Sequence, residues 1–168
     1  MAASRLRLNM DKTELMWTGT KYNCPSRTLG SAQVVGSDTE GVLGILLMPD
    51  LSLDKHVTAV SAKCFFQLRQ LRRIRHSPDD NSAATVVHAF VASRVDYCGS
   101  LLVGAPKKTT DKLQRVLNVA VRIVSNTRKY DRGLRQFRQH ELHWLGVYRV
   151  RFSVCVQVYK CLHNMEPG

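Results

Sequence analysis

The stretch from residue 51 to residue 75 constrains the fold more than any other part of the chain. Ser52 is a candidate N-cap at its start, and Pro78 follows its end, where the residue before a proline avoids the α region. Apolar residues recur within it at spacings of three and four, at Leu53, Val57, Val60, Cys64, Leu68 and Leu71. On a helix of 3.6 residues per turn this spacing forms one apolar stripe. The sequence therefore predicts a helix over residues 51–75 that buries one face.

The charge of the chain is concentrated after this helix begins. Lysine and arginine total 25 against 13 acidic residues, which gives a net charge of +12. Residues 1–53 hold five basic and five acidic residues, so residues 54–168 carry the whole surplus. A positive surplus of this size indicates a polyanionic partner, with nucleic acid ahead of an anionic membrane.

Two groups of basic residues are the candidates for contact with phosphates. The first group is Arg69, Arg72, Arg73 and Arg75, at the end of the predicted helix, where the helix dipole also favours cations. The second group is Lys107, Lys108, Lys112, Arg115, Arg128 and Lys129, with Arg122, Arg132, Arg135 and Arg138 adding to the same surplus. A solvated surface is the alternative for both groups. No base-reading motif occurs, so we expect binding to follow the nucleic-acid backbone and its shape.

The first third of the chain has the pattern of short strands. We expect strands over residues 14–19, 33–35 and 42–48, with a loop over residues 21–31. A sheet of this size is marginal in water by itself, which favours the edge of a larger sheet. The predicted fold class is α+β and mostly α, with an incomplete N-terminal sheet edge in residues 1–53 and a helical bundle in residues 54–168.

Three further helices are expected after residue 75. The first has a face formed by Ala83, Val86, Val87, Phe90 and Arg94, with Asn81 or Ser82 as its cap, and is interrupted at residues 97–100. The second has the cleanest amphipathic pattern, at Leu113, Val116, Leu117, Ala120, Val121 and Val124, with Thr109 or Thr110 as its cap. Residues 125–133 are expected to form a loop. The last helix follows residues 142–145 and points Tyr148, Phe152, Cys155, Val156, Tyr159 and Leu162 inward.

Residues that could carry metal chemistry are few. Asp79 and Asp80 could hold Mg²⁺, but their place at a helix start is explained by capping and by the helix dipole. A zinc site could draw on His140, His143, Cys155, Cys161 and His163. Their spacing is not that of paired zinc ligands, so packing in a core is the favoured interpretation. No nucleophile elbow, phosphate-binding loop or dinucleotide fingerprint occurs, and we assign no catalytic residue, no metal site and no cofactor.

Several features indicate an intracellular protein. The five cysteines are odd in number and scattered, which is typical of a reduced compartment. Residues 1–12 lack the apolar core of a signal peptide, and no apolar run approaches a bilayer span. We therefore expect a protein of the nucleus or cytoplasm that is not secreted and has no membrane partner.

Six motifs follow one another along the chain. They are Leu8-Asn9-Met10-Asp11-Lys12-Thr13-Glu14-Leu15-Met16, Leu43-Gly44-Ile45-Leu46, Leu51-Ser52-Leu53-Asp54-Lys55-His56-Val57, Ser93-Arg94-Val95-Asp96-Tyr97-Cys98, Leu113-Gln114-Arg115-Val116-Leu117-Asn118-Val119-Ala120 and Leu142-His143-Trp144-Leu145. In this order they resemble the C-terminal part of the reverse transcriptase, an RNA-directed DNA polymerase, of a LINE-type (non-LTR) retrotransposon.

The resemblance implies a role for each part of the chain. Residues 1–53 would be the remnant of a polymerase palm, in which Leu43, Gly44, Ile45 and Leu46 form the hairpin that holds the primer. Residues 54–168 would be the thumb and the region beyond it, which clasp an RNA or DNA duplex. The catalytic aspartates and their Mg²⁺ would belong to a segment upstream, with the fingers and the rest of the palm as possible partners. The alternative is a protein-interaction module without catalysis, or an orphan fragment without function.

The resemblance also yields a testable expectation about catalysis. No Tyr-Ala-Asp-Asp-type motif occurs in the chain, so the isolated protein should not extend a primer with Mg²⁺ or Mn²⁺ on an RNA template. Incorporation of nucleotides directed by the template, after any copurifying polymerase has been inactivated, would contradict this expectation.

Overall fold

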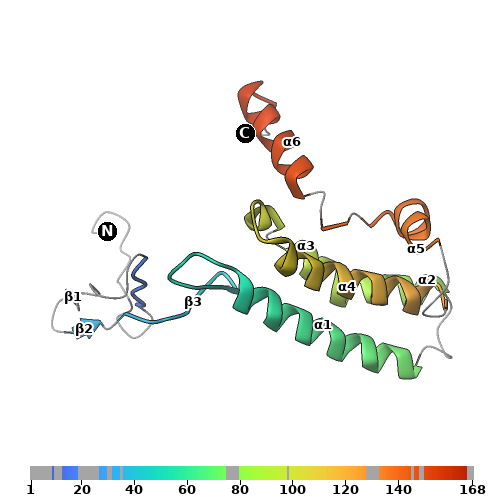
Figure 1. The fold of residues 1–168 in the computed structure, drawn as a ribbon, viewed down its shortest axis with the longest axis horizontal. Helices are drawn as coiled ribbons and strands as arrows, with labels where there is room; N and C mark the ends of the chain where they lie inside the picture. Colours follow the sequence, from blue (N-terminus) through green and yellow to red (C-terminus); the bar gives the residue numbers. More distant parts are fainter. Residues whose placement is uncertain are drawn as a thin grey trace. The chain divides into compact units, whose positions relative to one another are not determined.

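The computed structural model describes most of the chain and divides it into two compact units. The units are residues 1–56 and residues 57–168. The described residues are 9, 13–18, 27–29, 32–34, 36–74, 80–97, 99–127, 133–144, 146, 147 and 150–165. Short strands in the first unit and helices in the second confirm the predicted class, α+β and mostly α (Figure 1).

The strands of the first unit form two antiparallel hairpins. Strand β1 (Arg27–Leu29) pairs with β2 (Ala32–Val34), and β3 (Glu40–Val42) pairs with β4 (Ile45–Leu47). Strand β1 lies within residues 21–31, for which a loop was predicted, so that prediction was wrong over residues 27–29. The predicted strand over residues 14–19 was also wrong, because the described part of it makes one isolated bridge, from Leu15 to Gly36.

The second hairpin replaces the continuous strand expected over residues 42–48. Val42 pairs with Ile45, so the turn between the strands has two residues, Leu43 and Gly44. Their φ angles are 49° and 81°, and positive φ at both positions matches the right-handed twist of the flanking strands. The prediction failed because leucine is not a turn residue, so the apolar run showed no break.

Helix α1 (Asp54–Ile74) confirms the first predicted helix as far as the structure describes it. Leu53, Val57, Cys64 and Leu68 of the predicted stripe are buried, while Val60 and Leu71 are partly buried. Ser52 is not the cap, because its hydroxyl contacts the sulfur of Met48 at 3.4 Å and the helix begins at Asp54.

The next helix contains a wide π turn that the sequence did not predict. Helix α2 (Asp80–Val87) continues into η4 (His88–Ala92), a π segment, and then into α3 (Ser93–Asp96). The buried residues of this helix are Ala83, Val87, Val91, Ala92 and Val95. Phe90 is exposed, so its predicted inward position was wrong, and so was that of exposed Arg94. A π turn holds more residues than an α turn and therefore rotates every residue after it.

Helix α4 (Lys107–Val124) supplies the largest part of the core. All six predicted stripe residues are buried, and Thr109 and Ile123 are buried with them. Thr109 and Thr110 do not cap the helix, because it begins three residues before Thr110, after Pro106. A short 3-10 helix, η5 (Gly99–Leu102), lies before α4 and begins within the interruption expected at residues 97–100.

Helices α1, α2 and α4 lie side by side in the second unit (Figure 1). Figure 1 also shows α1 and α4 running in the same direction, with α2 and α3 running back. The ammonium of Lys112 donates a hydrogen bond of 3.0 Å to the hydroxyl of Thr58, which joins the early turns of α4 and α1. The early turns of these two helices are therefore neighbours.

A short helical segment between residues 134 and 141 escaped the sequence analysis. It consists of α5 (Leu134–Gln136) and the π segment η6 (Phe137–Glu141). Gly133 precedes it with a φ of 93°, a conformation that glycine adopts without strain. The segment is too short to show helical periodicity, and Gly133 was the signal available in the sequence.

The final helix, α6 (Val150–Leu162), does not bury the predicted face. None of its described side chains is buried, and Phe152, Cys155, Tyr159 and Leu162 are exposed. Its apolar residues surround the helix axis and form no single stripe, which explains the failure. Tyr148, the remaining predicted inward aromatic, lies outside the described residues.

We predict that Leu117→Asp unfolds the helical unit. Leu117 is 1% exposed in the middle of the α4 stripe, and an unpaired buried carboxylate there costs on the order of 4 kcal/mol or more. Circular dichroism should show lost helicity and a lost melting transition. Leu162→Asp is the matched control, because Leu162 is 76% exposed and should tolerate the same change. Native melting of the Leu117 variant would mean that this residue is not in a core.

Candidate nucleic-acid interface

The first group of predicted basic residues lies at the end of α1. Arg69, Arg72 and Arg73 are all exposed, and Arg72 and Arg73 lie in the last turn, where the helix C-terminus favours cations. Arg75 lies outside the described residues, as do Arg128 and Lys129 of the second group. The side chains of these three arginines are therefore accessible to a phosphate group in solution.

The second group begins at the N-terminus of a helix, α4, whereas the first group lies at the C-terminus of α1. Lys107 and Lys108 are exposed in the first turn of α4, which has no acidic residue. Cations are unfavourable at a helix N-terminus, because the dipole is positive there, and this costs about a few tenths of a kcal/mol or more. The same arrangement adds the dipole to two lysine charges and raises the attraction for an anion. Arg115 is also exposed, two turns further along α4.

Lys112 is placed differently from the rest of its group. It is partly buried, and its ammonium donates to Thr58 of α1. Its position between two helices fits a structural role as well as a share in the surface charge.

The structure separates the two described groups along the helix pair. Because Thr58 and Lys112 are in contact, Arg72 lies about 21 Å from that point along α1, at 1.5 Å per residue. Lys107 lies about 7.5 Å from it in the other direction along α4. The two groups are thus about 28 Å apart along the helices, which corresponds to about eight base pairs of a duplex at 3.4 Å each.

A hairpin does lie at the four residues assigned to holding a primer. Leu43 and Gly44 form its exposed turn, and the Leu43 side chain is 83% exposed. Ile45 is buried, and the Leu46 amide donates a 3.3 Å hydrogen bond to Nδ1 of His56. The turn is therefore the most exposed part of these four residues, and Leu46 is partly exposed. Its role in holding a primer stays a prediction.

The possible metal ligands are spread over exposed positions. His140, His143, Cys155, Cys161 and His163 are exposed, and Cys155 is therefore not in the core as expected. Within the part of the chain that the structure describes, no three His, Cys, Asp or Glu side chains gather in a metal-binding group. Asp80 begins α2 as expected, and Asp79 lies outside the described residues. Cys64 is buried in α1, and burial raises the pKa of its thiol.

A pair of carboxyl groups in the first unit was not found from the sequence. The Glu40 side chain is 5% exposed, and its Oε1 atom has no hydrogen-bond partner among the described residues. A hydrogen bond with the Glu14 side chain, burial and repulsion by Glu14 raise the pKa of Glu40, against an opposing hydrogen bond with Ser37. Because two carboxylates cannot hydrogen-bond without a proton, Glu40 holds its proton more tightly than an exposed glutamate does.

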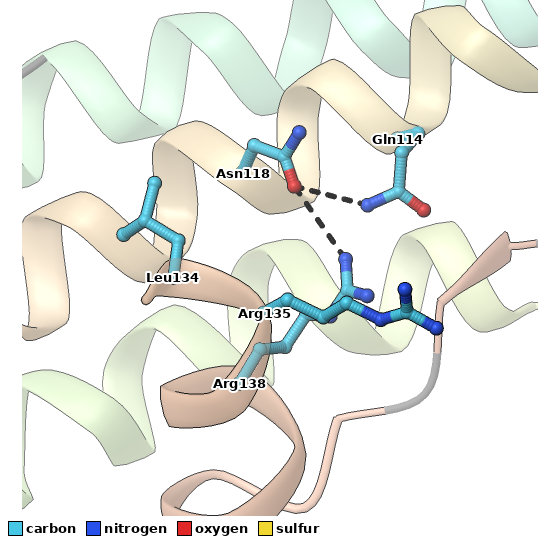
Figure 2. A pocket seen from close by; sticks show the side chains of 5 residues that line it. All are labelled: Gln114, Asn118, Leu134, Arg135 and Arg138. Carbon is cyan, nitrogen blue, oxygen red and sulfur yellow. Dashed lines mark hydrogen bonds between the residues drawn. The ribbon is translucent and has the colours of Figure 1, made fainter. Parts of the chain in front are cut away.

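A pocket in the helical unit that is lined by both polar and apolar groups also escaped the sequence analysis. It has a volume of about 500 Å³ and is lined by Gln114 and Asn118 of α4 and by Leu134, Arg135 and Arg138 of the α5–η6 segment (Figure 2). Arg138 is 4% exposed, so it is not part of the basic surface to which the sequence assigned it. Only the fold brings these two segments together, and no spacing in the sequence marks the site.

Comparisons of the chain with models of protein families, with curated proteins and with solved structures found no match. Among the described helices, none combines the length and the apolar character needed to cross a membrane.

The carboxyl pair makes the stability of the first unit depend on pH. Because the pKa of Glu40 is raised in the folded state, the folded protein binds more protons than the unfolded one. The contribution of Glu40 to the free energy of unfolding is therefore fully present below its ordinary pKa of 4.5. This contribution is lost as the pH rises through the raised pKa of the folded state. Glu40→Gln should remove this dependence and stabilise the unit near pH 7.

Urea unfolding monitored by Trp17 fluorescence in a Trp144→Phe background would measure this effect. Trp17 lies in the first unit and Trp144 in the second, so the remaining signal reports the unit that contains Glu40. Asp38→Asn is the control, since it removes an exposed carboxylate from the same unit. An unchanged pH dependence in the Glu40 variant would rule out the carboxyl pair as its source.

Proposed function

We propose that this chain binds the backbone of a nucleic-acid duplex and corresponds to the end of the palm and the thumb of a non-LTR retrotransposon reverse transcriptase. The observation that carries the proposal is the placement of exposed cations at both ends of the α1–α4 pair. Arg69, Arg72 and Arg73 lie at one end, and Lys107 and Lys108 at the other.

The spacing of these groups favours a duplex as the ligand. A separation of about 28 Å matches phosphates about eight base pairs apart on one duplex, whereas a small anion could meet only one group. Lysine and arginine contacts with phosphates carry no sequence information. Binding is therefore expected to be non-specific and to depend strongly on salt.

The hairpin turn supports contact by the first unit as well. Leu43 adopts a left-handed φ of 49°, which costs about 1 kcal/mol for a residue other than glycine, and exposes an apolar side chain. Asparagine adopts the positive φ of this turn position more readily than leucine does, so turn formation alone does not explain why a leucine is found there. Contact of the Leu43 side chain with a primer end would explain it.

The chain does not supply polymerase chemistry in this proposal. The catalytic aspartates and their Mg²⁺ would come from a palm and fingers segment outside this sequence. The duplex-binding part would then hold template and primer for a catalytic unit that it does not contain. A reduced compartment, nucleus or cytoplasm, fits the free thiols of Cys64, Cys155 and Cys161.

A protein-interaction module is the second candidate, and α6 favours it. Phe152, Val158, Tyr159 and Leu162 are all at least half exposed on this one helix. Apolar surface of this kind is typical of contacts with another protein. The two functions differ in their response to salt, since apolar association does not weaken as salt is raised.

Replacing the arginines of α1 tests the duplex proposal. The triple variant Arg69→Gln, Arg72→Gln and Arg73→Gln removes three charges and retains good helix formers. The logarithm of the binding constant should fall with the logarithm of salt concentration by about 0.9 for each phosphate that the protein neutralises on duplex DNA. The variant should therefore flatten the slope by about 0.9 for each phosphate that it no longer neutralises, equally for duplexes of different sequence.

A fluorescence-anisotropy titration of one labelled duplex at several salt concentrations measures the slope. The charge-matched control replaces Arg5, Arg7 and Lys12 of the first unit by Gln. Equal slopes in the parent and in the α1 variant would show that the α1 arginines are only solvated.

A further inference from the structure

The pocket between α4 and the α5–η6 segment presents hydrogen-bond donors and has few acceptors to offer. The backbone N–H of Val147 donates to Oε1 of Gln114 at 3.3 Å, and the Gln114 Nε2 atom donates to Oδ1 of Asn118 at 3.0 Å. Nη1 of Arg138 donates to the same Oδ1 atom at 3.5 Å. Figure 2 shows both bonds to Asn118 meeting at this one oxygen.

The chemistry of the donors fixes how these two amides are oriented. A backbone N–H and a guanidinium can only donate, so they must face the oxygen of Gln114 and the oxygen of Asn118. Both lone pairs of the Asn118 oxygen are then occupied by Gln114 and Arg138. The Asn118 NH₂ group and the guanidinium of Arg138 remain as donors at the pocket.

Arg138 is the group that this arrangement leaves unsatisfied. Its side chain is 4% exposed, and its Nε atom has no hydrogen-bond partner among the described residues. Among the described residues, the four other lining side chains are two amides, one leucine and Arg135, and none of them is acidic. A buried cation without an anionic partner is costly, so an anion brought from solution would relieve that cost.

A second arginine, Arg122, lies on the side of α4 that carries Gln114 and Asn118. Gln114, Asn118 and Arg122 are spaced four residues apart and therefore lie along one face of the helix. The Nε atom of Arg122 is also buried without a hydrogen-bond partner among the described residues. The unsatisfied donors thus extend one turn beyond the pocket lining, in the direction of the helix C-terminus.

We propose that this pocket binds the phosphate group of a phosphorylated ligand. Arginine forms paired hydrogen bonds with the oxygens of phosphate, and amide donors complete such a site. A bare phosphate would occupy only part of a pocket of about 500 Å³, and the Leu134 side chain offers an apolar surface for the group attached to it. The phosphate could belong to a free nucleotide or to the end of a polynucleotide.

The site is separate from the proposed duplex interface. It uses Arg138, Asn118 and Gln114, whereas the duplex interface uses exposed residues of α1 and the first turn of α4. Either proposal can fail while the other holds. Phosphate binding can be measured without any duplex present.

Two variants of the full-length chain test the site in different ways. Arg138→Met keeps an unbranched side chain as far as the position of Nε and removes the guanidinium with its charge, so it should weaken phosphate binding about tenfold or more. Asn118→Asp replaces the amide by a carboxylate of nearly the same size, which is an internal anion for Arg138. This carboxylate should compete with phosphate for Arg138 and so weaken phosphate binding as well. Both variants should melt at a higher temperature than the parent in phosphate-free buffer, because each relieves the unpaired charge.

The measurement is the melting temperature of each protein as inorganic phosphate is titrated. Sodium chloride at matched ionic strength gives the baseline, and Arg151→Met, at an exposed position of α6 outside both proposed sites, is the control variant. We expect a saturable rise in melting temperature for the parent and the Arg151 variant, and its loss in both site variants. The Asn118 variant keeps the test decisive if Arg138→Met fails to fold.

Further titrations identify the source of the phosphate. A 5′-mononucleotide and a single-stranded oligonucleotide, with and without a 5′-phosphate, are compared by the same melting assay. A response to the mononucleotide alone assigns a small-molecule ligand, and a response that requires the 5′-phosphate of the oligonucleotide assigns a polynucleotide end. Stabilisation no greater than that by sodium chloride, or stabilisation that persists in both variants, would overturn the proposal.

Discussion

The burial of one face of α4 determines the arrangement of the helical unit. Val116, Leu117, Ala120 and Val121 are all at most 1% exposed, so this face lies wholly within the core. Each buried apolar side chain of this size contributes about 1 to 3 kcal/mol. With that face fixed inward, the position of every other α4 residue follows from the helix period. The lysines of the first turn reach solvent, and Gln114 and Asn118 face the α5–η6 segment, with Arg122 one turn further along the same side of the helix.

The two proposed sites use different physical properties of the same helix. At the start of α4, exposed lysines add to the helix dipole in a solvent that screens them, so any contact there depends on salt. At the pocket, Arg138 is shielded from water, so its charge interacts more strongly and tolerates fewer partners. The first site suits a long, variable polyanion, and the second suits one group of defined geometry.

How much of the molecule could be predicted depended on the length and clarity of each pattern. The stripes of α1 and α4 span several turns and predicted both helices and the buried face of α4. The apolar run at residues 42–48 showed no break, because the turn at Leu43 and Gly44 depends on backbone angles that leucine rarely adopts. The apolar side chains of α6 are exposed and surround the helix axis, so they formed no single stripe from which a buried face could be predicted. The pocket depends on contacts between distant segments, so it left no local signal.

The π segment η4 determines how insertions and deletions would affect the second unit. Ala83, Val87, Val91 and Val95 are buried at a strict spacing of four, which drifts about 40° per step on a regular α-helix. The wide turn at His88–Ala92 compensates for part of this drift. Loss of a single codon within that segment would leave a regular helix in which Val95 follows Ala83 by one residue fewer, at about 20° from it around the axis, so Val95 would still face the core. The wide turn thus accommodates one residue more than regular geometry allows, so a further insertion there would turn Val95 away from the core whereas loss of one residue would not.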